Sequence, residues 1–182
     1  LVDRVRRVFE VVFGRGFHSL GMSLVFDVSH NIAKFETHEI NGKKRELCVH
    51  RKGATRAFGP GDPRIPTVYR GIGQPVLIPG DMGSGSYVLV GTGKAMNETF
   101  GSACHGAGRV LSRSAARKAT RGRDVFRELA GEDILVRSRS RRTLSEEVPE
   151  AYKDVDQVVR ATEGAGLVKR VARLRPLVVV KG

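Results

Sequence analysis

The dipeptide Asn41-Gly42 constrains the fold more than any other short stretch of this chain, because it joins two extended runs, residues 32–40 and 46–50. Asn-Gly favours a type I′ turn, in which both central residues take positive φ angles that match the twist of the flanking strands. Two extended runs on either side of this dipeptide are the strongest short-range signal for an antiparallel pair. We therefore predict a β-hairpin over this segment.

The other segments predict a mixture of strands and helices. Residues 1–13 place apolar side chains at helical spacing, and Leu1 gives the impression that the chain enters in mid-helix. Residues 59–75 are rich in Pro and Gly and predict an irregular loop, which Ile65, Val68 and Tyr69 should anchor. Because strands and helices alternate without βαβ regularity, we predict an α+β fold of mixed sheets with peripheral helices. Further helices are expected at 105–119, 123–130 and 154–163, and further strands at 24–28, 76–78, 86–90, 134–137 and 173–180.

Composition limits the class of protein. The chain has 182 residues and is 40% hydrophobic, which suits a globular domain with its own core. Aromatic residues make up only 6%, and Trp is absent, so Val, Leu, Ile and Ala should dominate that core. Lys and Arg number 32 against 19 Asp and Glu, which gives a net charge of +13. This excess indicates a polyanionic partner, nucleic acid first, although a basic surface from a hot or salty habitat is the alternative.

The cellular setting follows from what the sequence lacks. Cys48 and Cys104 form neither a CxxC pair nor a zinc framework, which favours a reduced cytoplasmic location. No apolar run has the length of a membrane span, and no secretory signal pattern opens the chain. We therefore expect no membrane partner.

The stretch "SACHGAGRVLSRSAARK", residues 102–118, is the most informative candidate site. Gly106 and Gly108 let backbone approach a ligand closely, and a helix starting after His105 would direct free N–H groups at a phosphate. Arg109 and Arg113 would share one face of that helix. An anion site is the first interpretation of this stretch. The alternative is that the imidazole of His105 attacks phosphorus and forms a phosphoramidate.

Three other stretches carry weaker signals. His30 and its neighbour Asn31 follow an apolar run and suit a metal or acid–base site, although a lone, partly buried histidine is the simpler interpretation. Residues 80–86, "GDMGSGS", can turn backbone N–H groups toward an anion or form a plain turn. Arg51 and Lys52 suit phosphate contacts or a solvated run of charge.

Taken together, these stretches resemble the RtcB-type RNA-splicing ligases, which use GTP. The resemblance rests on "DVSHNIAK", "VHRKGATRAF", "GQPVLIPGDMGSGSYVLVGT", "ETFGSACHGAGRVLSRS", "EEVPEAYKDV" and the terminal "LRPLVVVKG", which occur in the family's order. The match runs to the family's usual C-terminal end and begins partway through its length. It implies that residues 1–182 are the C-terminal portion of a single RtcB-like catalytic domain.

The resemblance implies a reaction and its participants. Such ligases join an RNA 3′-phosphate or 2′,3′-cyclic phosphate to a 5′-hydroxyl end, with GTP and two Mn²⁺ ions per complete site. A histidine, here His105, takes GMP from GTP, passes it to the RNA 3′-phosphate, and the 5′-hydroxyl then displaces GMP. Expected partners are RNA ends such as tRNA halves, the upstream half of the same protein and an archease-type activator protein.

The resemblance also implies roles for single residues. His30 would be a manganese ligand, Lys181 would reach the guanine, and Tyr152 would pack near the base. Asp81 departs from the family, since many members carry Ser or Thr there. Phosphate or RNA contacts fall to Arg51, Lys52, Arg109 and Arg113. Nucleotide contacts fall to His30, Asn31, Pro79, Gly80, Asp81, Met82, Ser86, His105, Gly106, Ala107, Gly108, Tyr152 and Lys181.

The family's other metal ligands, an Asp, a Cys and two His, belong to the upstream half, and neither Cys48 nor Cys104 matches that cysteine. The chain alone is therefore expected to be inactive. Two other functions compete with an RNA ligase. A non-enzymatic basic RNA-binding module explains the charge of +13 but neither His105 between glycines nor Lys181. A guanine-nucleotide phosphohydrolase would release phosphate from GTP without RNA.

Overall fold

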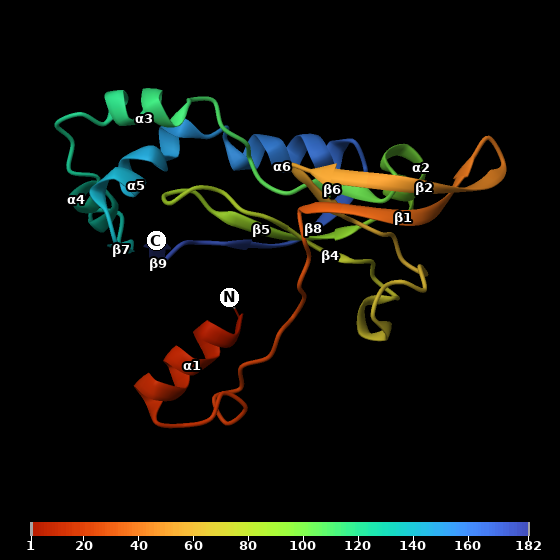
Figure 1. Ribbon diagram of the computed structural model, residues 1–182, viewed down its shortest axis with the longest axis horizontal. Coiled ribbons are helices and arrows are strands. Elements are labelled where there is room, and N and C mark those ends of the chain that lie inside the picture. The colour runs from red at the N-terminus through yellow and green to blue at the C-terminus, as the bar shows by residue number, and fades with distance from the viewer. Residues whose placement is uncertain (1, 182) are drawn as a thin grey trace.

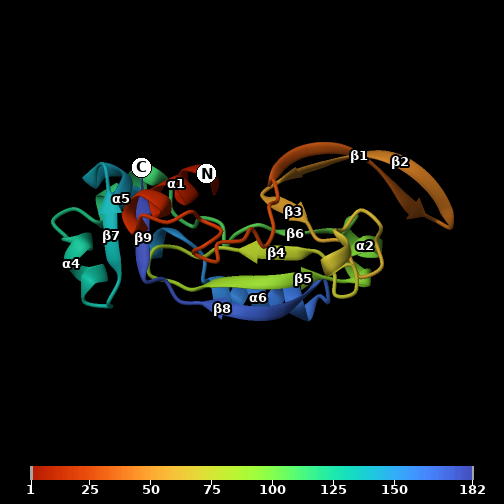
Figure 2. The same ribbon diagram turned by 90° about the horizontal axis from the view of Figure 1, so that it is seen from below.

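In the computed structural model, which describes residues 2–181, the predicted hairpin is confirmed. Strand β1 (Asn31–Ile40) pairs antiparallel with β2 (Lys43–Lys52). The φ angles of Asn41 and Gly42 are 52° and 74°, both positive as a type I′ turn requires. The hairpin extends well beyond the rest of the molecule, as Figure 2 shows. Its first residues, near His30, therefore lie at the body of the protein, whereas its turn lies far out.

The central sheet has three antiparallel strands in the order β4-β5-β8. These strands are β4 (Pro75–Ile78), β5 (Ser86–Gly91) and β8 (Val168–Leu174). Helix α6 (Val155–Gly164) covers the sheet and buries Val155 and Val159 in its core (Figure 1). The same core includes Ala107, which anchors the segment that follows His105. As the composition predicts, aliphatic residues dominate the core.

A second hydrophobic core lies beside this sheet, around the parallel pair β7 (Leu135–Ser138) and β9 (Val178–Lys181). Three short helices surround the pair: α3 (Arg113–Ala119), α4 (Val125–Ala130) and α5 (Arg141–Glu146). The 3-10 turn η2 (Pro149–Ala151) closes it. Met82 is only 1% exposed and inserts into this core from the loop between β4 and β5. The loop is thereby fixed between the two cores.

The remaining elements flank the base of the hairpin. Strand β3 (Ala54–Arg56) pairs with β6 (Ser102–Cys104), helix α2 (Gly93–Thr99) precedes β6, and η1 (Thr67–Tyr69) lies in the predicted loop. Helix α1 (Val2–Phe13) buries none of its residues and is set apart from the body (Figure 1). No helix among residues 2–181 combines the length and hydropathy that a membrane span needs.

A buried ion pair joins the hairpin to β6. Both terminal nitrogens of Arg51 donate to the Glu36 carboxylate, and each of these hydrogen bonds is 2.8 Å long. The Arg51 side chain is 1% exposed. Its Nε donates to Ser102 Oγ at 2.9 Å, and Nη2 donates to the Phe100 carbonyl at 2.9 Å. Burial alone would raise the pKa of Glu36, but the hydrogen bonds from Arg51 and His38 outweigh burial and hold the pKa below its ordinary value.

Several sequence predictions are wrong in detail. Residues 24–28 form no strand, because no neighbouring strand pairs with them; Val25 is 63% exposed and its carbonyl accepts from the Tyr69 hydroxyl. The strand expected at 173–180 is two strands in different sheets, because Pro176 lies between them and has no N–H for a ladder. Val68 is 77% exposed and anchors nothing, whereas Ile65 is buried. Two short helices, α2 and α5, were not expected.

The helix expected over 105–119 begins only at Arg113. Ser112 caps it, since the Ser112 hydroxyl accepts from the Ala115 N–H at 3.1 Å. Gly108 has a φ of 77°, which is outside the helical region, so residues 105–112 form a loop. Arg109 and Arg113 therefore do not share a helix face.

The Arg51–Glu36 pair predicts how the chain responds to acid. The pKa of Glu36 is lowered on folding, so its contribution to stability is present above the ordinary value of 4.5 and is lost as pH falls below it. Arg51→Ala should reduce the free energy of unfolding at pH 7 by about 3–5 kcal/mol, because the buried Glu36 carboxylate loses the guanidinium that contacts both its oxygens and keeps the His38 ring as a partner. Glu36→Gln should flatten the dependence of stability on pH below 4.5.

Urea denaturation of each variant, from pH 7 to below pH 4.5, measures how the free energy of unfolding depends on pH. Glu46→Gln, an exposed site on the same hairpin, is the matched control and should behave like the parent chain. An unchanged acid dependence in Glu36→Gln would contradict the assignment.

Candidate functional site

The two histidines that the sequence singles out lie face to face. His30 directly precedes β1, and His105 directly follows β6. Their rings are stacked, with centroids 4.4 Å apart and an interplanar angle of 24°. They are 75 positions apart in the sequence, and the ion pair of Arg51 links the strands that carry them.

The environment of His105 favours its neutral form. Partial burial, and then the proximity of His30, lower the pKa of His105 below its ordinary value of 6.5. A neutral imidazole keeps a lone pair on one ring nitrogen, which a nucleophile or a metal ligand needs. A neutral His105 is therefore compatible with either of these roles.

The loop after His105 is held on both sides. Gly106 lies against Pro79, because a Cβ built on Gly106 would meet the Pro79 ring and carbonyl at 3.8 Å. The Gly108 carbonyl accepts from the Lys153 N–H at 2.9 Å, and Arg109 forms a β-bridge with Tyr152. The structure thus brings the predicted segments 79–86, 105–109 and 152 together.

The loop between β4 and β5 is stabilised by its own carboxylate. Asp81 accepts from the N–H groups of Gly83 and Ser84 at 2.9 and 2.8 Å, and from the Ser84 hydroxyl at 2.6 Å. The Gly80 N–H donates to Ser86 Oγ at 3.3 Å. The N–H groups of Gly83 and Ser84, two of those that were predicted to face an anion, are therefore occupied by Asp81.

This loop forms one wall of an open cavity of about 340 Å³, and β9 forms the other. Gly80, Asp81, Met82 and Ser86 lie on the loop side, and Lys181 lies at the end of β9. A cavity of this size suits a small ligand such as a nucleoside. Five residues predicted to contact nucleotide thus line one cavity.

Two adjacent glutamates, Glu146 and Glu147, hold the basic residues near this cavity. The Arg109 guanidinium donates to the Glu147 carboxylate at 3.2 Å, the Tyr152 hydroxyl at 3.0 Å and the Glu146 carbonyl at 2.6 Å. Its donors are largely satisfied, which does not fit the predicted phosphate contact. The Arg113 side chain is 69% exposed and stays within 4.0 Å of both carboxylates. Sequence reasoning missed this acidic pair, although two adjacent glutamates before "VPEAY" in so basic a chain are a signal.

The two basic residues at the end of β2 have opposite environments. Arg51 is buried and engaged with Glu36, Ser102 and Phe100, so the prediction that it contacts RNA phosphates is wrong for this fold. Lys52 is exposed and lies opposite Asn31, the residue after His30. Strand alternation explains the difference, because neighbouring residues point to opposite faces.

A complete metal site does not form within the described part of the chain. Residues 2–181 contain no group of three or more His, Cys, Asp or Glu side chains arranged to hold an ion. The stacked His30 and His105 rings bring together only two such side chains. Both cysteine thiols are free, and Cys104 lies beside the Thr162 hydroxyl at 3.4 Å. The residues present thus do not fit a complete manganese site.

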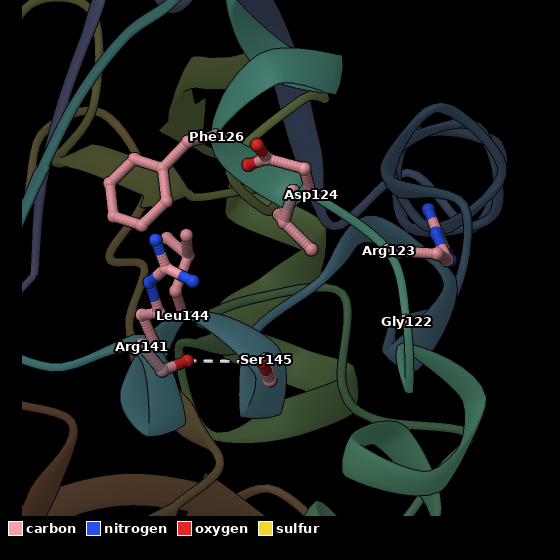
Figure 3. Close-up of a pocket in the computed structure, with 8 residues that line it drawn as sticks. Gly122, Arg123, Asp124, Phe126, Arg141, Leu144 and Ser145 are labelled. Carbon is pink, nitrogen blue, oxygen red and sulfur yellow. Dashed lines mark hydrogen bonds between the residues drawn. The ribbon is translucent and has the colours of Figure 1, made fainter.

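Another cavity, of about 400 Å³, lies between the start of α4 and α5 (Figure 3). None of the residues predicted from the sequence lines it. The Arg123 guanidinium already pairs with Glu128 at 2.6 Å and Glu150 at 2.8 Å, and Ser145 Oγ donates to the Arg141 carbonyl. Several of its polar groups are thus already engaged, and we assign no function to it.

Comparisons with known proteins match one family along the whole chain. The family model described as "tRNA-splicing ligase RtcB" matches residues 1–182. The chain is 60% identical to a protein of that name from Archaeoglobus fulgidus, over 98% of this chain and 37% of that protein. It is 58% identical to one from Pyrococcus abyssi, over 98% and 19%, and 55% identical to one from Thermococcus kodakarensis, over 98% and 37%. The chain thus spans well under half the length of these relatives.

The shape of the loop at the cavity predicts a sensitive position. A Cβ at Gly80 would clash with the Gly85 carbonyl, which is backbone and cannot move aside alone. Gly80→Ala should therefore reduce the free energy of unfolding by more than about 1 kcal/mol. Gly93→Ala is the control, since its Cβ meets nothing within 4 Å at the start of α2 and Ala favours helix. Urea denaturation measures the free energy of unfolding of both variants. Equal stabilities would contradict the close packing of this loop.

Proposed function

Because this chain belongs to the tRNA-splicing ligase RtcB family, we propose that it carries the nucleotide-transfer site of an RNA ligase acting in tRNA splicing and RNA repair. The observation that carries the proposal is the stacking of the His30 and His105 rings, next to Gly106, which lies against Pro79 at the start of the loop. The lowered pKa of His105, caused by burial and by His30, agrees with it. Its substrates are an RNA ending in a 3′-phosphate or 2′,3′-cyclic phosphate and an RNA with a 5′-hydroxyl, with tRNA halves as the expected pair.

In the proposed reaction, a ring nitrogen of His105 attacks the α-phosphorus of GTP. A phosphorus–nitrogen bond forms, the bond to the bridging oxygen breaks, and pyrophosphate leaves. The RNA 3′-phosphate then takes GMP from the histidine, and the 5′-hydroxyl of the second RNA displaces GMP. Backbone at Gly106, Ala107 and Gly108, which follow His105 directly in the chain, would contact the phosphate of the nucleotide.

The cavity beside β9 is the proposed site for the guanosine part of GTP. Lys181 would donate to the base, and Tyr152 would pack near it, while Asn31 would contact the phosphate beside His30. The loop would hold the nucleotide through Pro79, Gly80, Met82 and Ser86. Asp81 would act indirectly, because its carboxylate accepts from the loop's own N–H groups.

We propose His30 as one ligand of a site for two Mn²⁺ ions, which would neutralise phosphate charge when bound. The described residues supply no third ligand, so no step above is routed through the metal. The missing ligands are proposed to come from the upstream half of one catalytic domain, of which this chain is the C-terminal portion. An archease-type protein is the proposed activator, and the proposed location is cytoplasmic.

The proposed RNA contacts are Lys52 and Arg113, the more exposed of the predicted cations. The alternative function, a basic RNA-binding module without catalysis, is favoured only by the net charge of +13. It gives no reason for His30 and His105 to be stacked, and it predicts no covalent nucleotide.

His105→Ala tests the proposed nucleophile. The enzyme for the test is a chimera in which residues 1–182 replace the matching segment of the Archaeoglobus fulgidus relative. The variant should form no covalent GMP adduct with labelled GTP and Mn²⁺, because no ring nitrogen is left to attack phosphorus. RNA binding should persist, since Lys52 and Arg113 are unchanged. His18→Ala, an exposed histidine outside the site, is the control. Labelling of the His105→Ala chimera would remove His105 from this role.

The isolated chain should behave differently from the chimera. Residues 1–182 alone should bind Mn²⁺ weakly and form no GMP adduct, because residues 2–181 offer no complete set of metal ligands. Adding the separately made upstream portion of the Archaeoglobus fulgidus relative should restore labelling. Labelled GTP with Mn²⁺, followed by denaturing electrophoresis, gives the readout. Efficient labelling of the isolated chain would show that it holds a complete metal site of its own.

A further inference from the structure

Glu147 contacts four donors from four separate segments of the chain. Its carboxylate lies 3.2 Å from Arg109 Nη1, 3.8 Å from Lys181 Nζ and 4.0 Å from Arg113 Nε, and it accepts from the Tyr152 hydroxyl. The side chain is 17% exposed, so these interactions are partly shielded from water. Glu147 thus joins the end of β9 to the segment that follows His105.

The neighbouring Glu146 has a different set of partners. It pairs with Arg117 at 2.6 Å, Arg142 at 3.1 Å and Arg113 at 3.7 Å, all of which belong to helices α3 and α5. Its side chain is 14% exposed, similar to that of Glu147. The two adjacent carboxylates have equal charge and similar burial but different contacts. Glu146 pairs with residues of two helices, whereas Glu147 also contacts residues of the candidate nucleotide site.

The hydrogen bond between Tyr152 and Glu147 has a defined direction. Burial, and then Glu147, raise the pKa of Tyr152 above its ordinary value of 10.0, so its hydroxyl stays protonated and donates. The Arg109 guanidinium lies over the Tyr152 ring, 4.9 Å from its centroid, and so contacts the ring as well as its hydroxyl. The same carboxylate thus contacts both Tyr152 and Lys181.

We propose that Glu147 is a positioning residue for nucleotide selection, which orients Lys181 toward the cavity at β9. The inference rests on the proposed function, in which Lys181 meets the base. The ammonium lies 3.8 Å from the Glu147 carboxylate as an ion pair, and its N–H donors are available to an acceptor in the cavity. Guanine presents the O6 carbonyl as an acceptor, whereas adenine presents an amino donor at the equivalent position. A fixed ammonium therefore favours guanine, and a mobile one favours it less.

A purely structural role for Glu147 makes a different prediction. An ion pair that only stabilises the fold would lower the melting temperature when removed, and the preference between two nucleotides would stay the same. Nucleotide preference, and its dependence on Lys181, is therefore the discriminating measurement.

The experiment uses the chimera defined above, with Glu147→Gln, Lys181→Ala, the double variant and Glu146→Gln. The rate of covalent labelling at His105 is measured against the concentration of GTP and of ATP, with thermal unfolding alongside. Lys181→Ala should reduce the preference for GTP over ATP by about tenfold, and Glu147→Gln by a similar factor, because the two act as one unit. The double variant should be no worse than Lys181→Ala alone. Glu146→Gln, the matched control, should keep the preference within about twofold.

The outcomes separate this inference from the function on which it rests. If Lys181→Ala lowers the preference for GTP and Glu147→Gln leaves it unchanged, the positioning role is overturned and the proposed function stands. Multiplicative losses in the double variant also overturn the positioning role, because independent residues add their effects. If Lys181→Ala itself leaves the preference unchanged, the proposed contact between Lys181 and guanine is wrong, and the inference falls with it.

Discussion

The buried pair of Arg51 and Glu36 is the interaction on which the candidate site depends. The planar guanidinium satisfies both carboxylate oxygens, and its remaining contacts reach β6 through Ser102 and Phe100. Lysine, with a single flexible ammonium, cannot make these contacts together. Since His30 precedes β1 and His105 follows β6, the pair fixes the relative position of the two histidines. Replacing a buried pair with apolar residues often leaves stability unchanged, so its value here lies in geometry.

The charge distribution around the site differs from what the net charge of +13 suggests. Glu146 and Glu147 pair with Arg109, Arg117 and Lys181, so several cations nearest the cavity are already compensated. Arg109 is a structural residue of the site, because its donors are spent on Glu147, Tyr152 and backbone carbonyls. Lys52 and Arg113 are more exposed and remain available to an RNA backbone. A basic composition therefore indicates an anionic partner without identifying the residues that meet it.

Patterns among neighbouring residues predicted the local structure, whereas contacts between residues far apart in the sequence were not predicted. The Asn41-Gly42 turn and the strands near 76–78 and 86–90 follow from turn chemistry and short apolar runs, which neighbouring residues decide. The prediction of a strand at 24–28 was wrong, because a strand needs a neighbouring strand to pair with and the sequence pattern does not show whether one is present. Arg51 looked like one more exposed cation, because its partner Glu36 lies 15 positions away and faces it only through the hairpin register. The resemblance to a family assigns both His30 and His105 to the site, but the stacking of their rings was not predicted.

The loop at residues 79–86 shows how the site is organised before any ligand arrives. Asp81 supplies within the chain the negative oxygens that a bound phosphate otherwise supplies, and Met82 anchors the loop in the second core. Its shape is therefore set by folding alone, which lowers the conformational entropy that binding must remove. Lys181, by contrast, comes from the end of β9, and the long side chain of lysine has many rotamers. A rigid loop facing a flexible cation needs an additional group to orient that cation, and Glu147 is the carboxylate that lies within reach of it.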